Sequence, residues 1–176
     1  NVYKCLDNNG GATSTDEPTG VSTSVITTTD SYKWKFMYTL SAAQQSNFLS
    51  TDFMAVSSNA NANTDQSNVI SAAVDGAIDI VKIKTPGSGG TNGSFAGIPI
   101  RGDGNGGIAT VVVSGGAVTS VSVTTPGTGY TFATISNAQI VSAGATNLAG
   151  SELDVIIPPK GGHGANAQEE LGAFFV

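Results

Sequence analysis

The sequence predicts a mainly β protein made of β-sandwich layers with one or two short helices, plus an inserted small β module of two hairpin-like repeats. Three observations lead to this prediction. One segment alternates strictly, with aromatic residues gathered on its apolar face. A second segment, rich in Gly and Thr, occurs twice. The chain has 23 Gly and only 11% charged residues, a composition that favours strands and turns over helices.

The first predicted element is a strand over residues 2–6, Val-Tyr-Lys-Cys-Leu. It contains Cys5, the only cysteine, so the chain has no internal disulfide. We expect a small buried side chain there rather than a reactive thiol, because free cysteines are among the most buried residues. Residues 7–29 are polar, with turn residues at both ends, which predicts a long loop with a short edge strand at 21–27.

Residues 30–40 predict a half-buried strand, because apolar and polar side chains alternate along the whole segment. One face carries large apolar side chains, those of Tyr32, Trp34, Phe36, Tyr38 and Leu40. The other face carries Lys33, Lys35, Met37 and Thr39. We therefore expect the aromatic face to belong to the core, since the lysines on the opposite face need solvent.

A helix near 41–50 is predicted by Ser41 and Gln44, which have the spacing of a capping box. Phe48 and Leu49 are expected to turn inward from it. Residues 52–56 predict a further strand, and the polar, Asn-rich residues 57–68 predict a loop. Together, residues 1–68 are expected to form the first part of a β-sandwich core.

The repeated unit is found at 76–91 and again at 116–131. Eight of the sixteen aligned positions are identical, including the ordered pattern Thr-Pro-Gly-x-Gly, and three more are conservative changes. Gly115-Gly116 lies between two strand-like runs and predicts a two-residue hairpin turn, with Asp75-Gly76 as its counterpart. Each copy is expected to end in a Pro-Gly turn. We predict a small β module over 69–142 whose residues 69–74 are also compatible with a short helix.

The hairpin register assigns side chains to faces. In the second copy, one face is predicted to carry Ile108, Val112, Val121 and Val123. In the first copy, Val81 and Ile83 are expected on the matching face, and Lys82 and Lys84 are expected to point the other way.

Residues 143–176 are predicted to return to the β core. They comprise a buried strand over 153–157, a loop over 158–164, a helical turn over 167–171 and the start of another strand over 174–176. The chain begins in a strand-like run without Met and stops in an apolar run. We therefore expect it to be a piece of a longer chain.

Charge and the lack of a long apolar run each exclude one class of partner. The net charge is −6, and the seven basic residues are scattered, so the sequence predicts no binding of nucleic acid. No stretch approaches the roughly 18 consecutive apolar residues of a membrane helix, so no membrane partner is predicted.

Chemical motifs are weak. His163 is the only histidine, and neither a second histidine nor a thiolate can join it, although Glu169 and Glu170 follow it. We therefore predict a loop or interface histidine. The Gly-rich segment around Asp103 lacks the oxygen ligands of a calcium loop, and a tight turn is expected. Arg101-Gly102-Asp103 matches a tripeptide of some adhesive proteins but is expected by chance in a Gly-rich chain.

Further searches give the same result. Residues 159–162 lack the order of a phosphate-binding loop. The remaining acidic residues are dispersed and offer no pair for glycoside hydrolysis. The sequence thus predicts a protein that is not an enzyme, with no catalytic residue, no cofactor and no metal site.

Two segments together resemble a known family. They are Val2-Tyr3-Lys4-Cys5-Leu6-Asp7 and, after the polar loop, Asp30-Ser31-Tyr32-Lys33-Trp34-Lys35-Phe36-Met37-Tyr38. This pair of patterns resembles the baseplate wedge proteins of T4-like contractile-tailed bacteriophages. The segment 157–164, followed by Glu169-Glu170-Leu171-Gly172, is similar to the version in phages of marine bacteria. The likeness covers about a third of the chain, at its two ends, and the module 69–142 has no clear counterpart.

The resemblance implies a structural virion protein built mainly of β-sandwich layers. It implies a homodimer within each baseplate wedge, contacts with neighbouring wedge proteins, and a place in the tail baseplate after assembly in the bacterial cytoplasm. It carries over no catalytic residue.

Three hypotheses follow. The first is a subunit of the baseplate wedge that acts through protein–protein interfaces. The second is a carbohydrate-binding or adhesive β module on a phage or cell surface, which requires exposed aromatic residues on the strand 32–40 or near Tyr130 and Phe132. The third is a hydrolase, which requires carboxylates, or His163 with a partner, to converge in one pocket.

Overall fold

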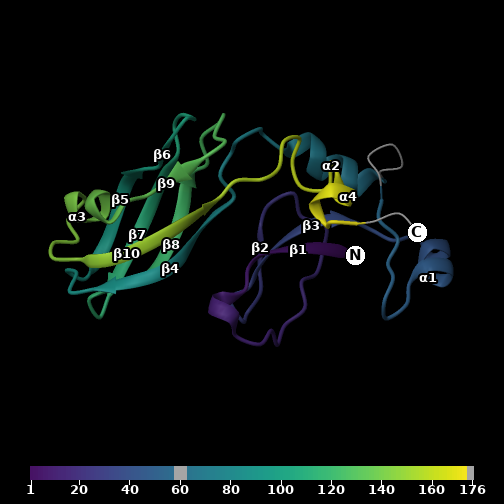
Figure 1. Cartoon of the computed structure of the whole chain (residues 1–176), viewed down its shortest axis with the longest axis horizontal. Helices are drawn as coiled ribbons and strands as arrows, with labels where there is room; N and C mark the ends of the chain where they lie inside the picture. Colours follow the sequence, from purple (N-terminus) through teal and green to yellow (C-terminus); the bar gives the residue numbers. More distant parts are fainter. Residues whose placement is uncertain (58–62, 174–176) are drawn as a thin grey trace. The chain divides into compact units, whose positions relative to one another are not determined.

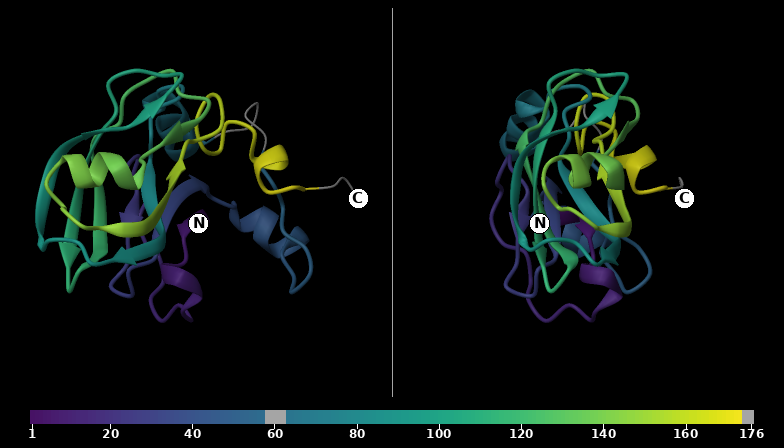
Figure 2. Two further views of the ribbon diagram at one scale, coloured as in Figure 1. Left: turned by 60° about the vertical axis from the view of Figure 1, so that its left-hand side comes forward. Right: turned by 90° about the vertical axis from the view of Figure 1, so that its left-hand side faces the viewer.

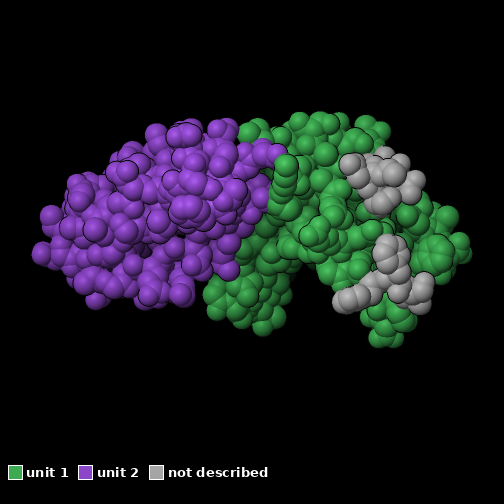
Figure 3. Space-filling model, turned by 45° about the horizontal axis from the view of Figure 1, so that its top comes forward, with its two compact units in different colours: residues 1–74, 159–176 green, residues 75–158 purple. Residues whose placement is uncertain are grey.

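The computed structural model describes residues 1–57 and 63–173 (Figure 1). Strands account for 36% of the structure and helices for 17%, in several small antiparallel sheets and short helices, so the predicted mainly β class is confirmed. The chain divides into two compact units (Figure 3): unit 1 is Asn1–Val74 with Pro159–Val176, and unit 2 is Asp75–Pro158.

Unit 2 contains the repeated segments, but its bounds differ from the predicted 69–142. Strand β10 (Ala149–Ile156) pairs with β4 (Ile80–Ser88), so the residues after 142 complete this unit instead of returning to the first. Residues 69–72 belong to helix α2 (Thr64–Ala72), which is part of unit 1. The strand that pairs with the first repeat copy, β10, lies beyond the end of the second copy and has no repeat pattern. The predicted C-terminal boundary at 142 is for this reason too early.

Unit 1 is built on a three-stranded antiparallel sheet in the order β1-β3-β2. Its elements are β1 (Val2–Asp7), the 3-10 turn η1 (Asn9–Gly11), β2 (Ile26–Thr27), β3 (Lys33–Tyr38), α1 (Ala42–Phe48), α2 (Thr64–Ala72) and α4 (Ala167–Glu170). The strands predicted at 2–6 and 30–40 are confirmed, and they pair directly, with Cys5 opposite Trp34. The predicted edge strand shrinks to two residues.

The aromatic residues of β3, together with Tyr32 just before the strand, pack within the unit. Phe36 is fully buried and meets Tyr3 edge to face, with 5.9 Å between the ring centroids. Tyr32 stacks on Trp34 at 5.5 Å. Trp34 is half-buried, and its indole N–H donates to the Thr28 hydroxyl at 3.3 Å.

The opposite side of β3 is buried at its end, which the alternating pattern did not predict. Met37 is fully buried in an apolar cluster with Val2, Leu40 and Ala167. Helix α2 contacts β3, and Ala167 is contributed by α4. Segments distant in the sequence therefore cover the second face.

The polar loop between β1 and β2 is fastened by two aspartates. The Asp30 carboxylate accepts hydrogen bonds from the Thr28 hydroxyl at 2.5 Å and the Thr15 N–H at 2.9 Å. These bonds, led by that from Thr28, hold the pKa of Asp30 well below its usual range. Asp16 in turn accepts from the Thr29 N–H and hydroxyl, both at 2.9 Å. The loop is thus tied to the start of β3 at two points.

Helix α1 begins as predicted. The Gln44 N–H donates to the Ser41 hydroxyl at 3.2 Å, and the Ser41 N–H donates to the Gln44 side chain at 2.8 Å, which completes the capping box.

Other local predictions for unit 1 are wrong. Cys5 is exposed, because the buried positions of β1 are Val2 and Leu6. Residues 52–56 form no strand within the described chain. The predicted loop 57–68 contains the start of α2, which Asn63 caps by accepting the Gln66 N–H at 2.8 Å. The predicted strand at 174–176 lies outside the described residues.

Unit 2 holds its apolar core between two sheets, β5-β7-β8 and β10-β4, in which β4 lies beside β8 (Figure 2). Its elements are β4 (Ile80–Ser88), β5 (Gly93–Pro99), β6 (Arg101–Gly102), β7 (Ile108–Ser114), β8 (Ala117–Thr125), β9 (Ala133–Thr134), α3 (Asn137–Ser142) and β10 (Ala149–Ile156). A separate two-stranded ribbon joins β6 to β9.

The second repeat forms the predicted hairpin between β7 and β8. Gly115 and Gly116 have φ of +60° and +81°, as this two-residue turn requires. Two register shifts place Val111 and Val113 in the core. The predicted face is therefore wrong for Ile108 and Val112. The bulges lie in β8, at Thr119 and Thr124, and they bring Val121 opposite the buried Val111.

The first repeat does not form a hairpin. Strand β4 pairs with β10, with Val81 opposite Val155, and the ladder continues through Pro86 so that no turn forms there. Val81 is buried and Lys84 is exposed, as predicted, and the Lys84 ammonium lies 3.1 Å from the Glu152 carboxylate. The two repeat copies thus pair differently: β4 pairs with β10, whereas β8 pairs with β7. The Pro-Gly pair continues the strand in the first copy and follows the end of the strand in the second.

The chain enters and leaves unit 2 at neighbouring points, and each unit holds its own pair of chain segments together there. Within unit 2, the Asp79 N–H donates to the Ile156 carbonyl oxygen at 3.0 Å. Within unit 1, a Cβ placed on Gly162 would lie 2.3 Å from Ala73 Cβ, so the chain entering unit 2 passes close to the chain returning from it.

Candidate protein-binding surface

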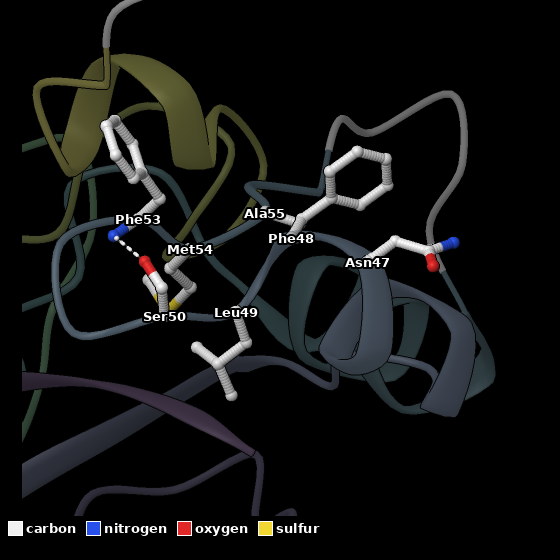
Figure 4. Close-up of a pocket in the computed structure, with 7 residues that line it drawn as sticks. All are labelled: Asn47, Phe48, Leu49, Ser50, Phe53, Met54 and Ala55. Carbon is white, nitrogen blue, oxygen red and sulfur yellow. Dashed lines mark hydrogen bonds between the residues drawn. The ribbon is translucent and has the colours of Figure 1, made fainter.

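Four large apolar side chains are exposed at the last residue of helix α1 and just after it. They are Phe48, Leu49, Phe53 and Met54, which we call the 48–54 surface. Phe48 is 60% exposed and Phe53 is 61% exposed. These side chains line a groove of about 640 Å³ with Asn47, Ser50 and Ala55 (Figure 4). Neighbouring exposed apolar side chains of this kind mark binding surfaces more often than single ones do.

A turn centred on Ser50 presents these side chains. The Ser50 N–H donates to the Phe53 carbonyl oxygen at 2.9 Å. The Ser50 hydroxyl accepts the N–H of Phe53 at 3.0 Å (Figure 4). It also accepts the N–H of Asp52 at 3.2 Å. Helix α1 ends just before it, where the Leu49 N–H donates to the Gln45 carbonyl oxygen at 3.2 Å. The prediction that Phe48 and Leu49 turn inward is wrong, because the chain leaves the helix at this turn.

None of the seven described residues that line the groove is ionisable, and the exposed Asp52 directly precedes Phe53 in the chain. At its inner end, the buried Tyr38 donates its hydroxyl hydrogen to the Ala55 carbonyl oxygen at 3.1 Å. Burial raises the pKa of Tyr38 to about 12. The surface therefore offers apolar contact and no acid–base group.

His163 lies in a second feature of unit 1, a buried ionic cluster. It is only 4% exposed, and its Nδ1 is hydrogen-bonded to the Glu170 carboxylate, which also accepts the Gly164 N–H at 3.1 Å. The Lys4 ammonium lies 3.7 Å from the same carboxylate and donates to the Glu170 carbonyl oxygen at 2.9 Å. The sequence placed a carboxylate near His163, but nothing in it indicated Lys4.

The cluster fits a structural role. Burial by itself raises the pKa of Glu170. The hydrogen bonds from His163 and Gly164 and the charges of His163 and Lys4 lower this pKa by a larger amount, so the net shift is downward. Because the histidine and the carboxylate are both shielded from solvent, a substrate could not reach them. The cluster joins α4 to β1.

Asp103 is engaged by its own loop. It accepts the N–H of Thr131 at 2.9 Å and that of Phe132 at 3.1 Å, and the Thr131 hydroxyl at 2.5 Å. These bonds, led by that from the Thr131 hydroxyl, lower the pKa of Asp103 to about 2. Its carboxylate is thus held in the turn, while Arg101 forms part of the ribbon strand β6.

The aromatic residues expected to contact sugars differ in exposure. Tyr130 is buried, whereas Phe132 is 62% exposed. At the start of β3, the stacking of Trp34 against Tyr32, which precedes the strand, uses ring faces that a sugar would need. Only Phe132 among these residues presents a largely open ring.

Among residues 1–57 and 63–173, no group of three or more His, Cys, Asp or Glu side chains is placed to hold a metal ion. In the same residues, no helix has the length and apolar character needed to cross a membrane. Comparisons with protein-family models, curated proteins and solved structures found no match to the chain.

Proposed function

We propose that this chain is a structural subunit of the baseplate wedge of a contractile phage tail, and that it assembles with neighbouring wedge proteins through the 48–54 surface. The exposure of Phe48, Leu49, Phe53 and Met54 carries the proposal. When a partner covers apolar area of this kind, the complex is stabilised by a free energy of about 25 cal/mol for each Å² removed from water.

A second observation supports the phage assignment. The two segments that resemble the wedge family, Val2–Asp7 and the strand beginning at Lys33, are hydrogen-bonded neighbours in one sheet. The likeness therefore falls on a single structural element instead of on two unrelated pieces of chain.

Location can be tested by immunogold labelling of contractile-tailed particles from the same source, with an antibody raised against this chain. We expect gold at the end of the tail that carries the baseplate. Labelling confined to the capsid, or to material outside the particles, would contradict the proposal.

The surface can be tested by a photoreactive amino acid placed at Phe53 and, as the matched control, at Phe132. The two side chains are almost equally exposed, at 61% and 62%, but lie in different units. In assembling particles we expect cross-links from position 53 to identified baseplate proteins, and fewer from position 132. Equal yields at both positions would remove the special role of the 48–54 surface.

A carbohydrate-binding module is the second candidate, favoured by the open ring of Phe132. A glycan array separates it from the first: binding that is lost in Phe132→Ala and retained in Phe53→Ala would favour carbohydrate recognition. The absence of glycan binding would leave the structural role as the better account.

A further inference from the structure

Residues 53–56, which begin within the 48–54 surface and continue past it, have the sequence of a strand but do not pair as one. The segment is Phe-Met-Ala-Val, an apolar run that predicts a strand. Within residues 1–57 and 63–173, none of the sheets includes it. A strand-type segment of this kind presents main-chain groups that another strand can pair with.

Hydrogen bonding along this segment alternates from residue to residue. Phe53 is tied to Ser50 through both its N–H and its carbonyl oxygen, and the Ala55 carbonyl oxygen accepts from Tyr38. No main-chain hydrogen bond joins Met54 or Val56 to another described residue. Because successive peptide groups of an extended chain point in opposite directions, this is the pattern of a strand with one satisfied edge and one open edge.

Side chains beside the open groups are apolar and uncharged. Phe53 and Met54 are exposed, and none of the described residues that line their groove is ionisable. Charged residues of a partner would lose hydration there without gaining an ion pair in the groove. The groove therefore suits a segment whose apolar side chains alternate along an extended main chain.

Charge also bears on the source of that segment. Each copy of this chain carries a net charge of −6 and Asp52 borders the groove, so a second copy or another acidic chain is repelled. We propose that Met54 and Val56 accept an added β-strand from a different protein, an extended segment that is apolar at alternate positions and has no acidic residue. This inference rests on the proposed use of the 48–54 surface as a protein interface, and it names the form of the partner.

The test uses the full chain, labelled with ¹⁵N, and a capped heptapeptide that alternates valine and threonine. A second peptide has the same sequence with every internal amide N-methylated, so that it keeps the side chains but cannot pair its main chain. We expect the amides of Met54 and Val56 to shift and to become at least about tenfold more protected from hydrogen exchange with the first peptide. The methylated peptide should bind at least about tenfold more weakly.

Two variants localise the effect. Phe53→Asp should weaken binding of the unmethylated peptide at least about tenfold by placing a charge at the groove, whereas the equally exposed Phe132→Asp should leave it unchanged. The wild-type exchange measurement stands even where a variant misfolds. Equal binding of both peptides, or no shift at Met54 and Val56 at millimolar peptide, would overturn strand addition.

A dimer of the chain alone that protects these two amides would also overturn it, since a second copy would then be the occupant. None of these outcomes bears on immunogold labelling or on cross-links to baseplate proteins, so the inference can fail while the proposed function stands.

Discussion

The Tyr130 hydroxyl donates a 2.9 Å hydrogen bond to the Ile100 carbonyl oxygen inside unit 2. It also accepts the Gly107 N–H at 3.1 Å, and the tyrosine is almost fully buried. One side chain thus satisfies two buried main-chain groups from the segment between β5 and β7.

Replacing Tyr130 by Phe should destabilise unit 2 by about 2 kcal/mol, because the Ile100 carbonyl and the Gly107 N–H lose their shared partner while buried. Chemical denaturation measures the loss as the free energy of unfolding of the unit that holds the residue, which is unit 2 for Tyr130 and unit 1 for Tyr3. Tyr3→Phe is the control. The Tyr3 hydroxyl donates to the Gly20 carbonyl oxygen at 2.7 Å at the exposed surface, where water can take the place of the lost hydroxyl. Equal losses in the two variants would show that burial is not the cause.

Glycine at position 76 is required by close packing as well as by backbone conformation. Its φ is +68°, and a Cβ there would lie 2.2 Å from the Tyr130 main-chain nitrogen. Gly76→Ala should therefore cost about 1 kcal/mol for the left-handed conformation and roughly 1–3 kcal/mol more for the overlap.

Gly115 provides the matched control, because its φ is +60° and nothing lies within 4 Å of the added Cβ. Gly115→Ala should cost only the conformational part, about 1 kcal/mol. Thermal unfolding of both variants checks the difference, and identical midpoints would contradict the packing argument.

Acid should loosen the turn that Asp103 holds. Its pKa is lowered from 3.8 to about 2 by the Thr131 and Phe132 hydrogen bonds, so the ionised carboxylate stabilises the folded turn. That contribution is complete above pH 3.8 and is lost as pH falls toward 2. A carboxyl ¹³C titration should give a midpoint near 2 for Asp103. A midpoint near 4 would mean that the bonds do not hold in solution.

Asp103→Asn separates this carboxylate from the other acids of the chain. The variant keeps one carbonyl oxygen for hydrogen bonding but has no charge to titrate, so the amides of Thr131 and Phe132 should lose their pH-dependent shifts between pH 2 and 4. Shifts that persist in the variant would point to another group.

The buried cluster in unit 1 should be sensitive to the loss of one carboxylate. Glu170→Gln removes the charge that faces His163 and Lys4, and we expect about 2–4 kcal/mol of destabilisation. Glu169→Gln, at the exposed neighbour that accepts from Asn166, should change stability by less than about 0.5 kcal/mol. Denaturant unfolding compares the two, and similar effects would exclude a special role for the cluster.

Sequence patterns predicted the elements whose causes are local. The capping box of Ser41 and Gln44 placed α1, and the glycine pair 115–116 placed the hairpin. The patterns failed where distant chain decides the outcome. Met37 is buried in a cluster that includes Ala167 of α4. Strand β4 pairs with a strand some seventy residues away along the chain in place of its expected hairpin partner.

The candidate surface and the buried cluster were also missed where local sequence does not decide the structure. Phe48 and Leu49 have the composition of a buried helix end, and only the turn at Ser50 directs them outward. The cluster of His163, Glu170 and Lys4 joins residues from both ends of the chain, and no spacing rule relates them.

The contact between Gly162 and Ala73 has a consequence for modularity. Unit 1 holds the two chain ends that border Asp75–Pro158 near one another, and unit 2 closes its own ends through Asp79 and Ile156. A unit such as unit 2, inserted between two segments of unit 1 whose ends lie close together, is a modular insertion. It can be excised and replaced by a short linker, or exchanged for another fold, with little demand on the host sheet.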